Sequence, residues 1–279
     1  MSAPSRRLSL AALTVIELAP PEMVSVAAAA GYQHVGLRLI PATPDDRSYA
    51  VIGDTPMVRE IKVRLADTGL SVLDVEVFRL RPDTDVQAFL PAIETAAALG
   101  ARHLLTTGQD PDSRRLRDRF AQLCDVAAAF GLTADLEFMP WTEISGLDEA
   151  LRLLADANRA NAGLVIDSLH FDRAAARLQD LAAVPPRCLH FMQLCDAPAA
   201  RPKTTEELIF QARSARLVPG RGELALIGLL RSLPADLPIS LEVPDAAAIG
   251  RVPALERARA AIAATRALLE RAHALPVQA

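Results

Sequence analysis

The chain has 279 residues, of which 51% are hydrophobic and 4% aromatic, and it carries a formal net charge of −4. The few aromatic residues and the lack of a basic stripe argue against nucleic acid as a partner. No run is long enough to span a membrane, the N-terminus lacks the apolar stretch of a signal peptide, and the three cysteines form no CxxC pair, so we expect a cytoplasmic protein with reduced thiols.

The first half of the chain alternates apolar runs, which we expect to be strands, with helical stretches. The expected strands are 7–15, 34–39, 70–77 and 101–106. The expected helices are one that opens after Pro20-Pro21, one over 56–68 and one over 86–99. Each helix is followed by glycine directly before a strand-like run, at Gly31, Gly69 and Gly100. A glycine in this place is typical of a helix end.

The second half continues the same alternation. The expected helices are 114–130, 147–157, 171–183, 224–232 and 252–274. The expected strands are 133–138, 163–167, 188–194 and 239–243. A long proline-containing loop is expected between 194 and 224.

The alternation makes eight strand–helix units, which predicts an α/β fold with a single (β/α)₈ TIM barrel and one domain over residues 1–279. An open, doubly wound sheet is the second candidate. No G-x-G-x-x-G follows any strand, so nothing in the sequence supports a dinucleotide site of that fold.

Four consecutive expected strands carry or end on a side-chain oxygen: Glu137, Asp167, Gln193 and Glu242. The carboxyl ends of barrel strands converge on one site, and buried carboxylates there need a cation or strong hydrogen bonds. The four oxygens therefore predict one divalent metal ion. Oxygen ligation favours Mg²⁺ or Mn²⁺, with Co²⁺ or Zn²⁺ as alternatives. The other interpretation is that one or two of the four are loop caps or surface residues.

Further groups are expected near the same mouth. His170 comes three residues after Asp167, where it could contact substrate or move a proton. Glu76 and Arg38 lie near the ends of strands three and two. Arg213 and Arg216 precede a glycine-containing turn and could hold a phosphate, carboxylate or hydroxyl group, although each could also be a surface charge.

The remaining histidines carry less information. His190 lies inside the seventh expected strand, where a packed or hydrogen-bonded role is the simpler interpretation. His34, His103 and His273 fall in no usable pattern.

Five short motifs give the chain a family resemblance. They are Leu136-Glu-Phe, Ile166-Asp-Ser-Leu-His-Phe, Met192-Gln-Leu-Cys-Asp-Ala, Val218-Pro-Gly-Arg-Gly-Glu-Leu and Ser240-Leu-Glu-Val. In this order they resemble the xylose isomerase-like barrel superfamily, which includes sugar phosphate isomerases and epimerases, inosose dehydratases and the AP endonuclease family 2 branch. The resemblance implies metal ligands at Glu137, Asp167, Gln193 and Glu242. It also implies that His170 and Arg216 face the substrate.

The resemblance implies a divalent-metal-dependent sugar or sugar phosphate isomerase or epimerase. Such an enzyme removes a proton next to a carbonyl through a metal-stabilised enediolate, with Glu137 and Glu242 as acid and base. Epimerases of this superfamily usually have histidine where this chain has Gln193. The set with glutamine is similar to bacterial 3-dehydroshikimate dehydratases, so a lyase acting on a cyclic polyol or keto acid stays open, with His170 as its acid or base. The endonuclease branch is disfavoured, because its trinuclear site needs more histidines.

A third interpretation is a non-catalytic barrel that binds a polyol. The expected partner is thus a small polyol, sugar or cyclic keto acid, with neither nucleic acid nor membrane involved. The sequence does not determine the oligomeric state, and a homodimer is one possibility.

Overall fold

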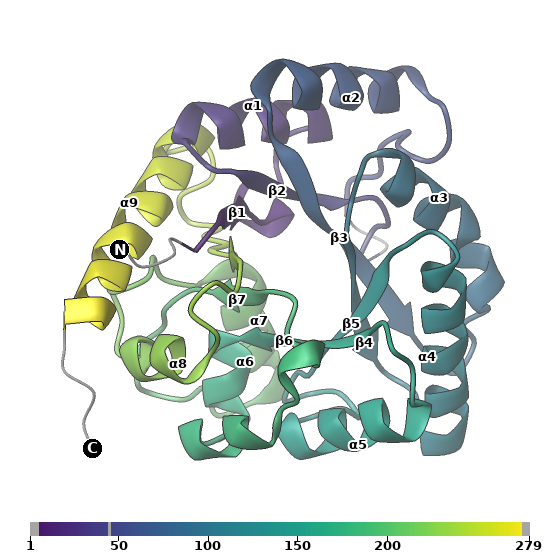
Figure 1. The fold of residues 1–279 in the computed structure, drawn as a ribbon. Coiled ribbons are helices and arrows are strands. Elements are labelled where there is room, and N and C mark those ends of the chain that lie inside the picture. The colour runs from purple at the N-terminus through teal and green to yellow at the C-terminus, as the bar shows by residue number, and fades with distance from the viewer. Residues whose placement is uncertain (1–5, 44–45, 275–279) are drawn as a thin grey trace.

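The computed structural model describes residues 6–43 and 46–274. Its eight strands are all parallel and close into a barrel in chain order, with β8 pairing back onto β1. The helices surround the barrel (Figure 1). The predicted (β/α)₈ TIM barrel is therefore confirmed.

The strands are β1 (Leu8–Leu10), β2 (His34–Arg38), β3 (Ser71–Leu80), β4 (His103–Gly108), β5 (Thr133–Glu137), β6 (Ala162–Asp167), β7 (Met192–Leu194) and β8 (Ile239–Leu241). The α-helices are α1 (Pro20–Ala30), α2 (Pro56–Thr68), α3 (Leu90–Ala98), α4 (Ser113–Ala128), α5 (Leu147–Ala157), α6 (Ser168–Arg173), α7 (Thr205–Ser214), α8 (Leu226–Ser232) and α9 (Ala254–Ala274). Helix α9 packs beside α1 and closes the ring (Figure 1).

Helix ends follow the local sequence closely in the first half. Gly31 and Gly69 end α1 and α2 with positive φ angles of 88° and 69°, a conformation that glycine adopts without a steric penalty. At the start of α2, the Thr55 side chain accepts a hydrogen bond from the Val58 amide. These caps fix the points at which the chain turns back into the barrel.

Several expected elements differ from the structure. Strand 7–15 ends at Leu10, and Ala12–Val15 is a 3₁₀ helix. In that helix the Thr14 hydroxyl donates to the Leu241 carbonyl and accepts from the Val243 amide, both at 2.8 Å. These hydrogen bonds hold the segment over the end of β8 instead of letting β1 continue.

The expected helix 171–183 is also divided. Helix α6 ends at Arg173, Ala175 has a positive φ of 55°, and Leu178–Ala183 forms a 3₁₀ helix. The expected seventh strand, 188–194, shortens to β7, because Pro186–Cys188 forms another 3₁₀ helix before it.

The prediction of one long loop after β7 is wrong in part, because the segment contains helix α7. Thr204 caps this helix by accepting from the Glu207 amide at 3.2 Å, and the Glu207 carboxylate accepts from the Thr204 amide at 3.2 Å. This reciprocal capping box stabilises a helix start among the prolines. It also decides where the arginines near the end of α7 lie.

The core has two parts. Most buried apolar side chains lie between the strands and the helices, and a smaller apolar cluster consists of Ala42, Leu73, Val77, Leu105, Val165 and Phe191. Because strand side chains alternate between faces, Ser9, Asp135, Gln193 and Ser240 point into the barrel between outward-packed neighbours. The barrel interior is thus partly polar. Among the described residues, no helix has both the length and the apolarity to cross a bilayer.

Candidate active site

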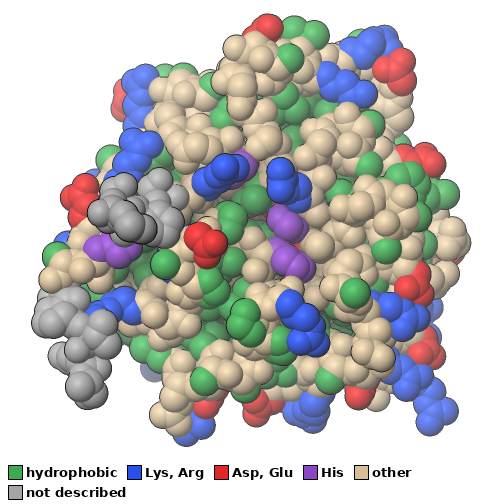
Figure 2. Space-filling view, in the orientation of Figure 1, with side chains coloured by type: hydrophobic (Ala, Val, Ile, Leu, Met, Phe, Trp, Pro, Cys, Tyr) green, Lys and Arg blue, Asp and Glu red, His purple; other side chains and the backbone are tan. Residues whose placement is uncertain are grey.

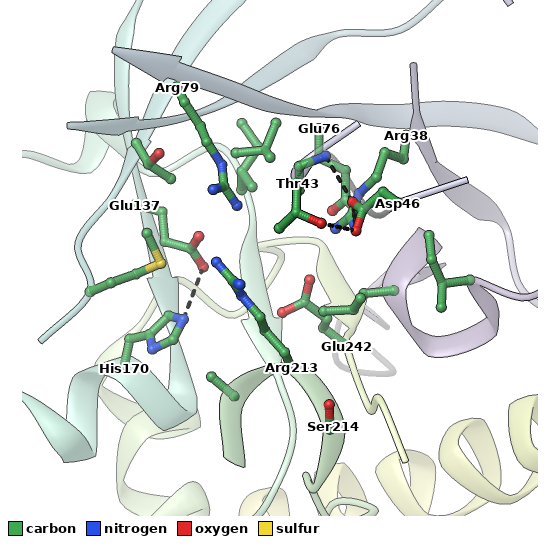
Figure 3. Close-up of a pocket in the computed structure, with 18 of the residues that line it drawn as sticks. Arg38, Thr43, Asp46, Glu76, Arg79, Glu137, His170, Arg213, Ser214 and Glu242 are labelled. Carbon is green, nitrogen blue, oxygen red and sulfur yellow. Dashed lines mark hydrogen bonds and ion pairs between the residues drawn. The ribbon is translucent and has the colours of Figure 1, made fainter. Parts of the chain in front are cut away.

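A cavity of about 320 Å³ opens at the carboxyl ends of the strands, where barrel enzymes place their chemistry. Its walls include seven of the residues singled out in the sequence: Arg38, Glu76, Glu137, His170, Arg213, Arg216 and Glu242. Figure 3 shows several of these side chains pointing into the same space. Asp167 and Gln193 are not part of the cavity wall, and both are completely buried.

Asp167 ends β6 and caps α6. One carboxylate oxygen, Oδ1, accepts hydrogen bonds from the amides of Leu169 at 2.8 Å and His170 at 2.9 Å. The other, Oδ2, accepts from Arg216 Nη1 at 2.6 Å. Burial raises the pKa of Asp167, but Arg216 and these hydrogen bonds outweigh it and the net shift is downward. Asp167 is therefore a buried carboxylate.

Arg216, just after α7, lies between two carboxylates. Its Nε donates to the Ala212 carbonyl at 2.7 Å, which fixes the guanidinium against the end of the helix. Its terminal nitrogens contact Asp167 at 2.6 Å and Glu242 Oε2 at 2.8 Å. Only 3% of Arg216 is exposed, so these ion pairs lie in a medium of low polarity.

Glu137, at the end of β5, faces His170. Its Oε1 lies 3.8 Å from His170 Nε2 and has no hydrogen-bond partner among the described residues. The His170 ring packs edge-on against Trp141, with ring centroids 5.1 Å apart. His170 is thus held in place beside a carboxyl group that has a free lone pair.

The cavity shifts the pKa values of its carboxyl groups and of its histidine in opposite directions. Burial, together with Asp167 and Glu242, raises the pKa of Glu137 well above its usual value. Burial also raises the pKa of Glu242 to about 7, against the opposing effect of Arg216. Burial lowers the pKa of His170 to about 4, so the imidazole is neutral at pH 7. Glu242, with a pKa of about 7, can exchange a proton with a substrate near neutral pH, whereas Glu137 favours its protonated form and His170 its neutral form.

Arg38 and Glu76 form a separate pair on the wall. Arg38, at the end of β2, contacts Glu76 Oε1 at 2.8 Å and Asp46 Oδ2 at 3.5 Å. Because this guanidinium already has carboxylate partners, it is less available to a ligand than an unpaired arginine.

Two further arginines enter the cavity, and sequence reasoning missed one of them. Arg79 lies in β3, and Arg213 lies in the last turn of α7; in Figure 3 both side chains point into the cavity from opposite sides. Burial and then the charge of Arg213 lower the pKa of Arg79 to about 10. Within residues 6–43 and 46–274, neither guanidinium has a carboxylate within 4.0 Å.

Arg79 was missed because β3 extends to Leu80, beyond the expected strand end at 77. The signal was present in the apolar alternation of Phe78 and Leu80, which continues the strand pattern.

The donors predicted to hold a metal ion are compatible with one. Two of the four predicted donors, Glu137 and Asp167, have ligand atoms within 4.8 Å of one another, and the third member of this group is His170, which was predicted to face the substrate and not to bind the ion. Glu137 Oε1 and both amide atoms of Gln193 are buried without a hydrogen-bond partner among the described residues, a costly state that a bound cation or water would relieve. Gln193 is aligned with Asp167 in the sheet, and Glu242 reaches Asp167 through Arg216. The oxygen-rich set suits a hard divalent cation.

The chain matches the model of the xylose isomerase-like TIM barrel family over residues 24–270. A 3-dehydroshikimate dehydratase of Pseudomonas aeruginosa is 32% identical over 132 residues, which cover 46% of this chain and 20% of that enzyme. An inosose isomerase of Bacillus subtilis is 25% identical over 160 residues, 53% of this chain and 55% of that enzyme. These matches therefore span only part of the curated relatives.

Solved structures of low identity share the fold. The IOLI protein with a bound zinc atom superposes with a TM-score of 0.77 at 17% identity, covering 96% of this chain and 100% of that one. A D-allulose 3-epimerase from a Methylomonas species, in complex with D-allulose, has a TM-score of 0.67 at 18% identity, covering 96% and 99%.

Proposed function

The chain belongs to the xylose isomerase-like TIM barrel family, and we propose that it is a divalent-metal-dependent enzyme that removes a proton next to the carbonyl of a small sugar, keto polyol or cyclic keto acid. Glu137, Asp167, Gln193 and Glu242 would hold the ion. When bound, the ion would act as a Lewis acid that stabilises negative charge on substrate oxygens.

The side chains of the cavity supply the proton chemistry. His170 is neutral at pH 7, its Nδ1 has no hydrogen-bond partner in the described part of the chain, and its Nε2 lies beside Glu137, so it can accept a proton from a carbon acid. Glu137, with its raised pKa, can accept or return a proton on its side of the cavity. Trp141 and Met139 line the wall near these groups and limit access of water.

The observation that carries the choice of reaction is the pair Arg79 and Arg213. Two guanidinium groups that repel each other in a small cavity are stabilised by an anion between them. This favours a substrate with a carboxylate or phosphate, and among the named relatives it fits the 3-dehydroshikimate dehydratase, whose substrate carries a carboxylate. Proton removal next to the carbonyl, followed by loss of the β-hydroxyl, would then give a conjugated product.

The second candidate is isomerisation or epimerisation, which sequence reasoning put first. It is supported by Glu137 and Glu242, which line one cavity from non-neighbouring strands and both have raised pKa values. One could remove a proton and the other return it on the opposite face. The inosose isomerase relatives fit this reaction with a neutral substrate.

A substrate panel tests the proposal. 3-Dehydroshikimate, inosose, D-allulose and a sugar phosphate are incubated with the enzyme and Mg²⁺ or Mn²⁺, and absorbance of a conjugated product is recorded beside isomer formation. Elimination from an anionic substrate is the expected result. Turnover of the neutral compounds alone would favour the second candidate.

A further inference from the structure

A second group of metal-binding side chains lies at the opposite end of the barrel from the cavity. His103 is the first residue of β4, Asp135 is the third residue of β5, and His190 comes two residues before β7. All strands are parallel, so these positions lie at or near the amino ends of the strands. One ring nitrogen from each histidine and a carboxylate oxygen of Asp135 lie within 4.8 Å of one another.

Both imidazoles turn the same atom toward the carboxylate. Asp135 lies 2.6 Å from His190 Nδ1 and 3.6 Å from His103 Nδ1. The two rings are parallel, with centroids 5.3 Å apart and an interplanar angle of 7°. Phe191 packs against the His103 ring, with centroids 5.4 Å apart. The orientation of the rings is thus fixed by packing before any ligand enters.

The two histidines of the group are partly exposed to solvent, and its carboxylate is not. Asp135 is fully buried, whereas the His103 and His190 side chains are 12% and 21% exposed. Figure 2 shows histidine side chains gathered near the middle of the visible face, with Lys or Arg side chains beside them. Because His103 and His190 are partly exposed and neither lines the catalytic cavity, an ion could reach the group without passing through that cavity.

The neighbouring backbone leaves room for the group. A Cβ atom at position 163 would overlap the Asp135 carboxylate and lie 2.5 Å from His190 Nδ1, so only glycine fits beside them. The Thr133 hydroxyl lies 2.8 Å from His103 Nδ1 and also contacts Asp135. Such outer contacts orient ligands around a metal ion.

We propose that His103, His190 and Asp135 form a second metal site, for a divalent transition metal of the Zn²⁺ or Co²⁺ class. Two imidazoles and one carboxylate are a common ligand set for these ions, while Mg²⁺ prefers oxygen alone. The bound ion would replace the proton shared by His190 and Asp135 and would link β4, β5 and the segment before β7. This site is independent of the proposed function, because none of its residues lines the cavity.

The test is metal stoichiometry on the full chain. Metal-stripped wild-type protein is titrated with Co²⁺ or Zn²⁺ by calorimetry, beside H103A/H190A and the control H34A, which changes a histidine at the start of β2. We expect the double variant to bind one ion fewer than wild type and H34A, and Mg²⁺-supported turnover to be retained. Unchanged stoichiometry in the double variant would overturn the site.

A second measurement covers the case in which the double variant does not fold. Crystals of the wild-type protein are soaked in ZnCl₂ and diffraction is recorded at the zinc absorption edge. An anomalous peak between the Nδ1 atoms and the Asp135 carboxylate is expected. Zinc peaks elsewhere with none at this position would reject the proposal and leave a metal-free ion-pair network.

Discussion

Asp167 and Glu242 come from different strands of the barrel and share one guanidinium, because Arg216 contacts the first at 2.6 Å and the second at 2.8 Å. A position for positive charge therefore exists between two buried carboxylates. Removing one carboxylate would leave Arg216 paired with the other alone, so the guanidinium would lose one of its two buried ion-pair partners.

Replacing Glu242 with glutamine tests this arrangement and the metal site together. E242Q keeps the shape of the side chain but removes a charged oxygen ligand. We expect weaker binding of Mg²⁺ or Mn²⁺ by at least about tenfold and loss of turnover, with the folded barrel retained. Calorimetry and circular dichroism measure the two effects.

The matched control is E256Q, which changes an exposed glutamate in the first turn of α9. It should bind metal and turn over substrate like wild type. Full metal occupancy and full activity in E242Q would show that Glu242 is not a ligand.

The arginine pair predicts a charge requirement in the substrate. R213A should raise KM for an anionic substrate by about ten- to a hundredfold, because a charge-assisted hydrogen bond is typically worth 1.5–3 kcal/mol. It should leave KM for a neutral polyol nearly unchanged. R81A changes an exposed arginine two residues from Arg79 and serves as the control. An equal loss of affinity for both substrate types would contradict an anion site.

Replacing His170 with alanine separates the two candidate reactions. In a dehydratase His170 is the best-placed neutral base, so H170A should lower kcat by about 10²–10⁴-fold. In an epimerase that uses Glu137 and Glu242, the same change should mainly raise KM. The kcat and KM values of H170A, measured with the substrate found in the panel, decide between the two.

His190 and His34 predict opposite effects of pH on stability. Hydrogen bonding to Asp135 raises the pKa of His190 in spite of burial. The stabilisation of the fold by protonated His190 is therefore fully present below about pH 6.5 and is lost as the pH rises through the pKa of His190 in the folded protein. Burial and nearby arginines lower the pKa of His34 to about 4. The stabilisation of the fold by neutral His34 is therefore lost as the pH falls from about 6.5 toward 4.

Urea unfolding of wild type, H190Q and H34Q, with EDTA present and between pH 4.5 and 8.5, measures this difference. The stability gap between wild type and H190Q should shrink as pH rises, and the gap for H34Q should grow. Parallel pH profiles for the three proteins would contradict the assigned shifts.

The sequence predicted the barrel well because its signals are local. Helix-ending glycines such as Gly31 and Gly69 and the apolar strand runs lie in sequence where they act in the fold. It failed where tertiary contacts decide: Thr14 folds the end of the first expected strand over β8. Helix α7 was hidden by flanking prolines, although its capping residues Thr204 and Glu207 were readable.

In the candidate site too, the residues set by local sequence could be predicted and those set by tertiary contacts could not. Residues at strand ends, such as Glu137 and Glu242, could be named from the sequence because parallel strands bring their ends together. The partnership of Asp167 with Arg216 depends on the three-dimensional position of α7, and no spacing encodes it. Arg79 could be placed at the cavity only once β3 was known to extend to Leu80.

The most direct test of the central claim is proton NMR of candidate substrates incubated with the enzyme and Mg²⁺ in deuterium oxide. Removal of a proton next to a carbonyl predicts one of two signatures: a new unsaturated product after elimination, or deuterium at the reacting carbon of recovered substrate after reprotonation. Both signatures should vanish in E242Q. If every anionic and neutral candidate stays unchanged with metal present, the chain is not such an enzyme, and the polyol-binding interpretation takes its place.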